Sequence, residues 1–212
     1  MSCEIEKAFS LIRAQLKLSA VPEDSGHAEN TLIWLLRLCP EADQALQLAA
    51  LAHDIERSRA NRLSRHDFSD YDAFKALHAA IGARIAARIF REAGVERAIG
   101  REACRLIRLH ESGGDKRSDL LKDADSISFF DHNLPAYFER EGMDESLRRA
   151  RWGYARLSAR GRDHVARIRH SCPELQRVLA SAISTGTFTP SASLTDNGPP
   201  KHGGRVRHSA SR

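Results

Sequence analysis

Apolar residues recur at three- and four-residue intervals along most of this chain, which is the period of an amphipathic α-helix. The first helix shows the pattern clearly, because Ile5, Phe9, Ile12 and Leu16 fall on one face. By the same spacing we expect helices over residues 4–18, 25–39, 41–55, 72–92, 95–110 and 117–132, and further helical structure over 135–184. No alternating strand pattern competes with this reading. The predicted fold class is therefore all-α.

Capping residues and breaks set the ends of these helices. Asp24 or Ser25 can accept hydrogen bonds at the start of the second helix, and Asp70 or Asp72 at the start of the helix that ends near residue 92. Gly94 suits the end of that long helix. Residues 57–72 are polar and without apolar period, so we expect a loop. Its arginines at 57, 59, 62 and 65 would suit a phosphate ligand, although charged loops are usually only solvated surface.

The helix over 41–55 ends in an unusual way. Its apolar run, residues 46–52, leads directly into His53 and Asp54. Burying an imidazole beside a carboxylate is costly unless something pairs with them, and a divalent metal is one such partner. The same dipeptide at His66 and Asp67 follows no apolar run, so we interpret it as part of the loop.

Other histidines and acidic residues fall on or beside separate predicted helices. The full set of candidate metal ligands is His27, His53, Asp54, His78, His110 and Asp125. Four members have simpler explanations. His27 would be an exposed histidine in the first turn of its helix, and His53 a satisfied core histidine next to a capping Asp54. His78 would be a core histidine bonded to a carbonyl, and His110 a histidine at the negative end of a helix dipole. Asp123 and Asp125 cannot share a helix face, so only one of the two should point at a metal.

The order His, His-Asp, His, His, Asp resembles the HD-domain superfamily of metal-dependent phosphohydrolases. Residues 53–57 (HDIER) look like the signature helix end of that family, residues 78–83 like its next helix, and residues 121–126 like its final Ala-Asp segment. The match covers residues 20–135. It implies a compact orthogonal helical bundle, with residues 1–185 as one HD-type domain.

The resemblance also implies roles. It selects Asp125 over Asp123 as a ligand, and it makes Asp54 the carboxylate that bridges two metal ions. The mixed nitrogen and oxygen donors suit Mn, Fe, Co, Ni or Zn better than Mg or Ca. We expect two such divalent transition metal ions, with Arg57 and Lys122 as catalytic neighbours that neutralise phosphate charge. The substrate would be a nucleotide or other small phosphate ester.

Composition narrows the alternatives. The 212 residues are 42% hydrophobic and only 6% aromatic, and no apolar stretch approaches a membrane span. Four scattered cysteines favour a reducing, cytoplasmic location. The net charge is +5, and residues 186–212 are rich in Ser, Thr, Pro and Gly, so we expect a disordered basic tail. No P-loop, nucleophile elbow or dinucleotide-binding turn occurs.

Two other functions fit parts of this pattern. Some relatives of the HD superfamily use the same six ligands in a di-iron oxygenase. The arginines between residues 148 and 169 accompany Trp152 and Tyr154 and indicate a surface for nucleic acid, as in a non-catalytic binding module. A packing face made by Leu147, Ala150 and Leu157 favours a helix pair on the core instead.

Overall fold

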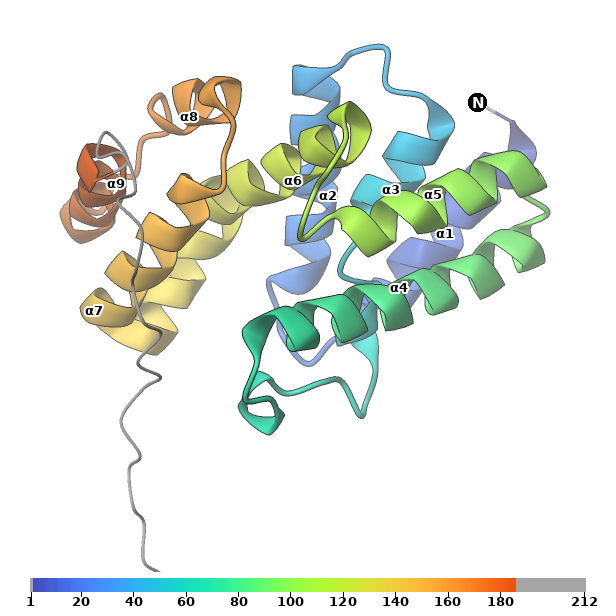
Figure 1. Ribbon diagram of the computed structural model, residues 1–212, viewed down its shortest axis with the longest axis horizontal. Helices are drawn as coiled ribbons and strands as arrows, with labels where there is room; N and C mark the ends of the chain where they lie inside the picture. Colours follow the sequence, from blue (N-terminus) through green and yellow to red (C-terminus); the bar gives the residue numbers. More distant parts are fainter. Residues whose placement is uncertain (1, 186–212) are drawn as a thin grey trace, which may run out of the picture.

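A computed structural model describes residues 2–185, and these residues form an all-helical domain (Figure 1). The α-helices are α1 (Cys3–Leu16), α2 (Asp24–Leu38), α3 (Gln44–Ala52), α4 (Tyr71–Ala93), α5 (Arg97–Leu109), α6 (Lys116–Ser128), α7 (Leu134–Ala155), α8 (Ala159–Val165) and α9 (Pro173–Thr185). Short 3₁₀ turns η1 (Ile55–Ser58) and η2 (Arg65–Asp67) follow α3, and the π-helical turn η3 (Phe129–Asn133) joins α6 to α7. The predicted all-α class is confirmed. The predicted tail, residues 186–212, lies outside the described residues.

Helix α3 is the centre of the fold, because it packs against α1, α2, α5 and α6. Its residues 48–52 are completely buried, so the second half of this helix is apolar on every side, whereas Gln44 and Gln47 in the first half are partly buried. Asp43 starts it by accepting a hydrogen bond from the backbone N–H of Leu46 at 3.0 Å. The surrounding helices thereby hold the C-terminal end of α3, where His53 and Asp54 follow, inside the molecule.

The remaining helices form two groups (Figure 1). Helix α4 packs along α5 and α1, and α2 packs along α6, so these helices enclose α3. The π-helical turn then leads the chain away to α7, which packs mainly on α9. Phe130, fully buried in this turn, contacts the backbone of α7 near Gly153. One continuous core therefore includes both groups.

Several helix ends differ from the prediction. The N-cap of α2 is Glu23, without a side-chain capping bond, and Asp24 is instead buried. The expected helical stretch 135–184 is interrupted, because Gly142 has a non-helical conformation (φ 78°) and two further breaks separate α7, α8 and α9. In contrast, Asp70 caps α4 and Gly94 ends it with φ 81°, as predicted. No helix among residues 2–185 is long and apolar enough to cross a membrane.

Candidate metal centre

The six candidate ligands converge on one region at the end of α3. The structure groups them into two triads, and in each the donor atoms lie within 4.8 Å of one another. The first triad is His27, His53 and Asp125, and the second is Asp54, His78 and His110. Together the two triads, which we call the metal centre, take residues from α2, the end of α3, α4, the end of α5 and α6.

The first triad is closely packed. The Nε2 atom of His27 lies 3.2 Å from Nε2 of His53 and 3.1 Å from Oδ1 of Asp125. The distance from His53 Nε2 to the same Asp125 oxygen is 3.6 Å. Two imidazole nitrogens and one carboxylate oxygen therefore face one point, which is the donor set of a transition-metal site.

Asp54 turns its two oxygens toward different histidines. Its Oδ1 lies 2.9 Å from His78 Nε2 and 3.8 Å from His110 Nε2. Its Oδ2 lies 3.8 Å from His53 Nε2 and 4.0 Å from His27 Nε2. A carboxylate between two groups of imidazoles has the geometry required to bridge two ions.

In each histidine, Nδ1, the ring nitrogen that points away from the metal centre, has a hydrogen-bond partner. Nδ1 of His53 faces the carbonyl of Ala50 at 2.9 Å, and Nδ1 of His110 faces the carbonyl of Ile107 at 2.7 Å. A carbonyl only accepts, so each Nδ1 carries the proton and each Nε2 is directed inward. His27 Nδ1 meets the Ser128 hydroxyl at 2.9 Å, and this hydroxyl in turn donates to the His27 carbonyl.

Glu56 orients His78, the fourth histidine of the centre, by a hydrogen bond. Its buried carboxylate accepts from Nδ1 of His78 at 3.0 Å and from the backbone N–H of Leu63 at 3.0 Å. A carboxylate behind a histidine fixes the ring and makes the opposite nitrogen a better ligand. Through Leu63, the same carboxylate also attaches the segment 57–72 to the metal centre.

The electrostatics of this cluster favour bound cations. Burial opposes the charged form of His53 and His78, but the neighbouring carboxylates outweigh it and raise the pKa of His53 to about 9 and of His78 to about 10. Burial likewise opposes ionisation of Asp54 and Asp125, yet the surrounding histidines hold the pKa of both carboxyls well below the usual range. Without a metal ion, protons on these histidines, together with Arg57 and Arg156, balance the two carboxylates.

Protonation does not provide a partner for His110. Burial lowers its pKa, so the ring is neutral at pH 7, and its Nδ1–H is already donated to Ile107. Its Nε2 is buried and has no hydrogen-bond partner among residues 2–185. A buried acceptor without a donor is costly, and a metal ion in the second triad would supply the missing partner. The residues present therefore fit a divalent metal.

A cavity of about 390 Å³ opens onto the metal centre. Four of the six ligands line it: His27, Asp54, His78 and Asp125. The segment 57–72 contributes Arg57, Arg62 and Arg65 to its wall, and α7 contributes Arg140 and Arg149. The cavity thus combines a site for metal ions with several guanidinium groups, which suits an anionic ligand.

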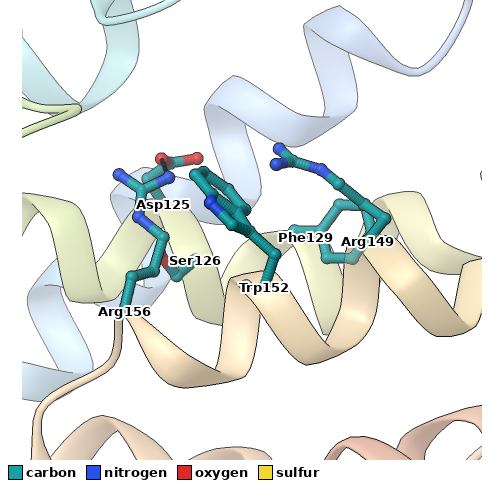
Figure 2. A pocket seen from close by; sticks show the side chains of 7 residues that line it. Asp125, Ser126, Phe129, Arg149, Trp152 and Arg156 are labelled. Atoms are coloured by element: carbon teal, nitrogen blue, oxygen red, sulfur yellow. Dashed lines mark ion pairs between the residues drawn. The ribbon is translucent and has the colours of Figure 1, made fainter. Parts of the chain in front are cut away.

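Two arginines contact the ligands directly. Arg57 lies 2.9 Å from Asp24 and 3.7 Å from Asp54, and these two carboxylates raise the pKa of Arg57 against its burial. Arg156, at the end of α7, lies 3.2 Å from Glu111 and 3.7 Å from Asp125 (Figure 2). It also donates to the carbonyls of His110 and Glu111. Arg156 thus connects the end of α7 to the C-terminal ends of both α5 and α6.

Two other candidate residues lie elsewhere. Asp123 accepts from the backbone N–H of Ser158 at 2.9 Å and from the Ser158 hydroxyl, so it fixes the start of α8. It belongs to neither triad. Lys122 pairs with Asp119 at 2.9 Å and does not line the cavity. The structure therefore brings Asp125 and Arg57 to the centre, but not Asp123 or Lys122.

The sequence interpretation missed four residues of this region: Glu56, Glu111, Ser128 and Arg156. Glu56 and Glu111 directly follow predicted ligand segments, so their positions offered a signal. Ser128 lies in the same predicted helix as Asp125 but carried no signal of its own, and Arg156 was one of the arginines interpreted as a nucleic-acid surface or as part of a helix pair packed on the core.

The comparisons with known proteins add a family but no activity. No curated protein matches this chain. No solved structure matches it either. A family model described as a domain of unknown function, DUF4202, matches residues 11–179, a range that contains all six candidate ligands and the first turns of α9. The chain therefore belongs to the DUF4202 family.

Proposed function

We propose that this protein is a metal-dependent phosphohydrolase of the HD type, which hydrolyses a nucleotide or another small phosphate ester by means of metal-activated water. The main support is the unpartnered Nε2 of His110 within the buried second triad. The first triad lies next to it, and the two oxygens of Asp54 face histidines of both triads. Bound divalent ions would lower the pKa of water and polarise a phosphoryl group.

The residues of the chain supply the rest of the chemistry. The two triads would each hold one ion, with Asp54 between them. Glu56, Ser128 and the two backbone carbonyls orient the imidazoles, so the ligands need no rearrangement on binding. Arg57, at the cavity wall, is placed to neutralise charge that develops on a phosphoryl group near Asp54.

The cavity favours hydrolysis of an anionic ester over oxygen activation. The six ligands themselves would suit either chemistry. However, three of the five arginines that line the cavity, Arg62, Arg65 and Arg149, form no ion pair within residues 2–185, and an anionic substrate would give them a partner where an uncharged one would not. These arginines bear on the substrate rather than on the metal, so the experiment must examine both.

Asp54→Asn tests the proposal most directly, because it keeps the side-chain shape and removes the bridging charge. The wild-type protein, loaded with Mn, Co or Ni, should release phosphate from a panel of phosphomonoesters and phosphodiesters. The variant should lose activity by more than about a hundredfold, since even partners outside the ligand set cost 10–100-fold when mutated. Metal analysis should show the matching loss of bound metal.

Asp67→Asn provides the matched control. Asp67 follows a histidine just as Asp54 does, but it is exposed in η2 and belongs to neither triad. This variant should keep full activity and metal content. Fully metal-loaded wild type that releases no phosphate from any ester would contradict the proposal. Uptake of O₂ by the iron-loaded protein would then favour the oxygenase.

A further inference from the structure

A row of two aromatic rings with an arginine at each end joins the segment 57–72 to α7 beside the metal centre. The Cζ atom of Arg65 lies 5.0 Å from the ring centre of Tyr71, and the Tyr71 ring meets the Trp152 ring edge-on at 5.9 Å. The Cζ atom of Arg149 lies 4.3 Å from the ring centre of Trp152. We call these four residues the Arg–aromatic row.

The two arginines of this row lack acidic partners. Neither Arg65 nor Arg149 forms an ion pair with any residue between 2 and 185, although both line the 390 Å³ cavity. Two other cavity arginines are paired, since Arg57 pairs with Asp24 and Arg140 pairs with Glu23 at 2.7 Å, whereas the exposed Arg62 is not. Arg65 and Arg149 therefore each bring to the cavity wall a positive charge without an ion-pair partner among residues 2–185.

The aromatic contacts leave N–H groups of both arginines available. Arg149 donates no hydrogen bond within residues 2–185, and Arg65 donates only through Nη1, to the Phe68 carbonyl at 2.5 Å. The remaining N–H groups of a guanidinium form a fixed fork that matches a phosphate group. Figure 2 shows Trp152 between the guanidinium groups of Arg149 and Arg156. Arg156 is committed to Glu111 and Asp125, whereas Arg149 is free to contact a ligand.

The Arg–aromatic row lies next to the cavity that opens onto the metal centre, so one ligand can reach both. Asp125, Phe129 and Arg149 line both the large cavity and the small pocket around Trp152. A ligand with one phosphate group at the metal centre would therefore extend toward Arg149. A monophosphate would leave the two unneutralised arginines of the row without a partner.

We infer that Arg65 and Arg149, held by Tyr71 and Trp152, form an anion subsite that binds a second phosphate group of the ligand, so that the cavity selects compounds with a diphosphate group over monophosphates. The placement of the first phosphate group rests on the proposed function. The anion subsite itself does not require bound metal.

Calorimetric titration of the full-length, metal-depleted protein tests this subsite without turnover. Inorganic pyrophosphate should bind at least about tenfold more tightly than inorganic phosphate, and Arg149→Ala should weaken pyrophosphate binding by about tenfold, the effect of one lost charged hydrogen bond. Arg149→Lys should recover only part of the affinity, because an ammonium cannot stack or bind in a fork. In a Trp34→Phe background, pyrophosphate should also change the fluorescence of Trp152.

Arg148→Ala is the matched control, because Arg148 is adjacent, exposed and paired with Glu145, outside the cavity. It should bind pyrophosphate as the wild type does, and far-UV circular dichroism should confirm that every variant is folded. Arg65→Ala gives an independent test on the other element and should show the same loss. Wild-type affinity in both Arg149→Ala and Arg65→Ala, or equal binding of phosphate and pyrophosphate by the wild type, would overturn the inference. Because no metal is present, either result leaves the phosphohydrolase proposal standing.

Discussion

Two His-Asp dipeptides show why environment decides what a residue can do. His53 and Asp54 follow a helix whose second half is buried on every side, whereas His66 and Asp67 lie in an exposed turn. The apolar run before His53 made this difference predictable from the sequence. The position of Glu56 beside Asp54 offered a signal, but its contact with His78 and the contact of Arg156 with Asp125 were not predictable, because they join segments that are brought together only by the fold.

The number of metal ions depends on His78 and His110, the two histidines of the second triad. The first triad and Asp54 would form a one-metal site without them. We predict that His78→Ala and His110→Ala each reduce bound metal from about two ions to about one, because the phosphoryl clamp requires two. Metal analysis of the saturated, purified protein measures this number, and phosphate release should fall by orders of magnitude in the same variants.

Both substitutions should leave the fold in place, because the core contacts of α4 and α5 are formed by other residues. Thermal unfolding followed by circular dichroism, with the midpoint compared to that of the wild type, checks this. A wild-type protein that saturates at one ion, with normal hydrolysis by both variants, would rule out the second metal site. The first triad would remain as a one-metal centre.

Glu56 should act through His78 rather than on the substrate. Glu56→Ala removes the acceptor of the His78 Nδ1–H, and we expect the affinity for the second ion to fall by about 10–100-fold, the usual effect of such a partner. Glu56→Gln keeps an acceptor oxygen and should restore much of that affinity. Competition with a metal-binding dye measures both values. Equal affinity in all three proteins would show that the contact at 3.0 Å does not orient the ring.

At the scale of the elements, the sequence predicted helix positions well and some helix ends poorly. Asp70 and Gly94 act locally, so their roles at the two ends of α4 were visible in the sequence. Asp24 was expected as a cap, but Arg57 at 2.9 Å and the Ser19 hydroxyl at 2.6 Å bind its side chain instead. A long-range ion pair thus replaced a local capping bond, and such competition is not encoded in helical periodicity.

Asp43 starts the central helix α3 and also binds Arg117, with both contacts at 2.9 Å. We predict that Asp43→Ala lowers the free energy of unfolding by about 0.5–2 kcal/mol, since it removes the N-cap. Asp43→Asn keeps a capping oxygen and loses only a surface ion pair, so it should cost less than about 1 kcal/mol. Denaturant unfolding gives both values. Equal losses for Asn and Ala would show that the ion pair, rather than the cap, matters at this position.

At the scale of the whole molecule, α7 joins the C-terminal helices to the metal centre. The sequence indicated one domain over residues 1–185 but gave no reason for the C-terminal helices to reach the candidate ligands. The reason is structural: Phe130 packs beneath α7, and Arg156 at the end of α7 approaches Asp125. Residues assigned to packing therefore also support the site, and its integrity should depend on α7.

One continuous core predicts that the two groups of helices unfold together. Trp34 reports on α2 and Trp152 on α7, so Trp34→Phe and Trp152→Phe each leave one fluorescent probe in a different group. In each variant, the fluorescence transition in denaturant should coincide with the far-UV circular dichroism transition, as expected for two-state unfolding. Adding Phe130→Ala, which empties a fully buried site, should lower the free energy of unfolding by about 3–5 kcal/mol and should shift both signals by the same amount. If Phe130→Ala moved only the Trp152 transition, α7–α9 would form a separate unfolding unit, and the support that Arg156 gives to Asp125 would be lost before the bundle around α3 unfolds.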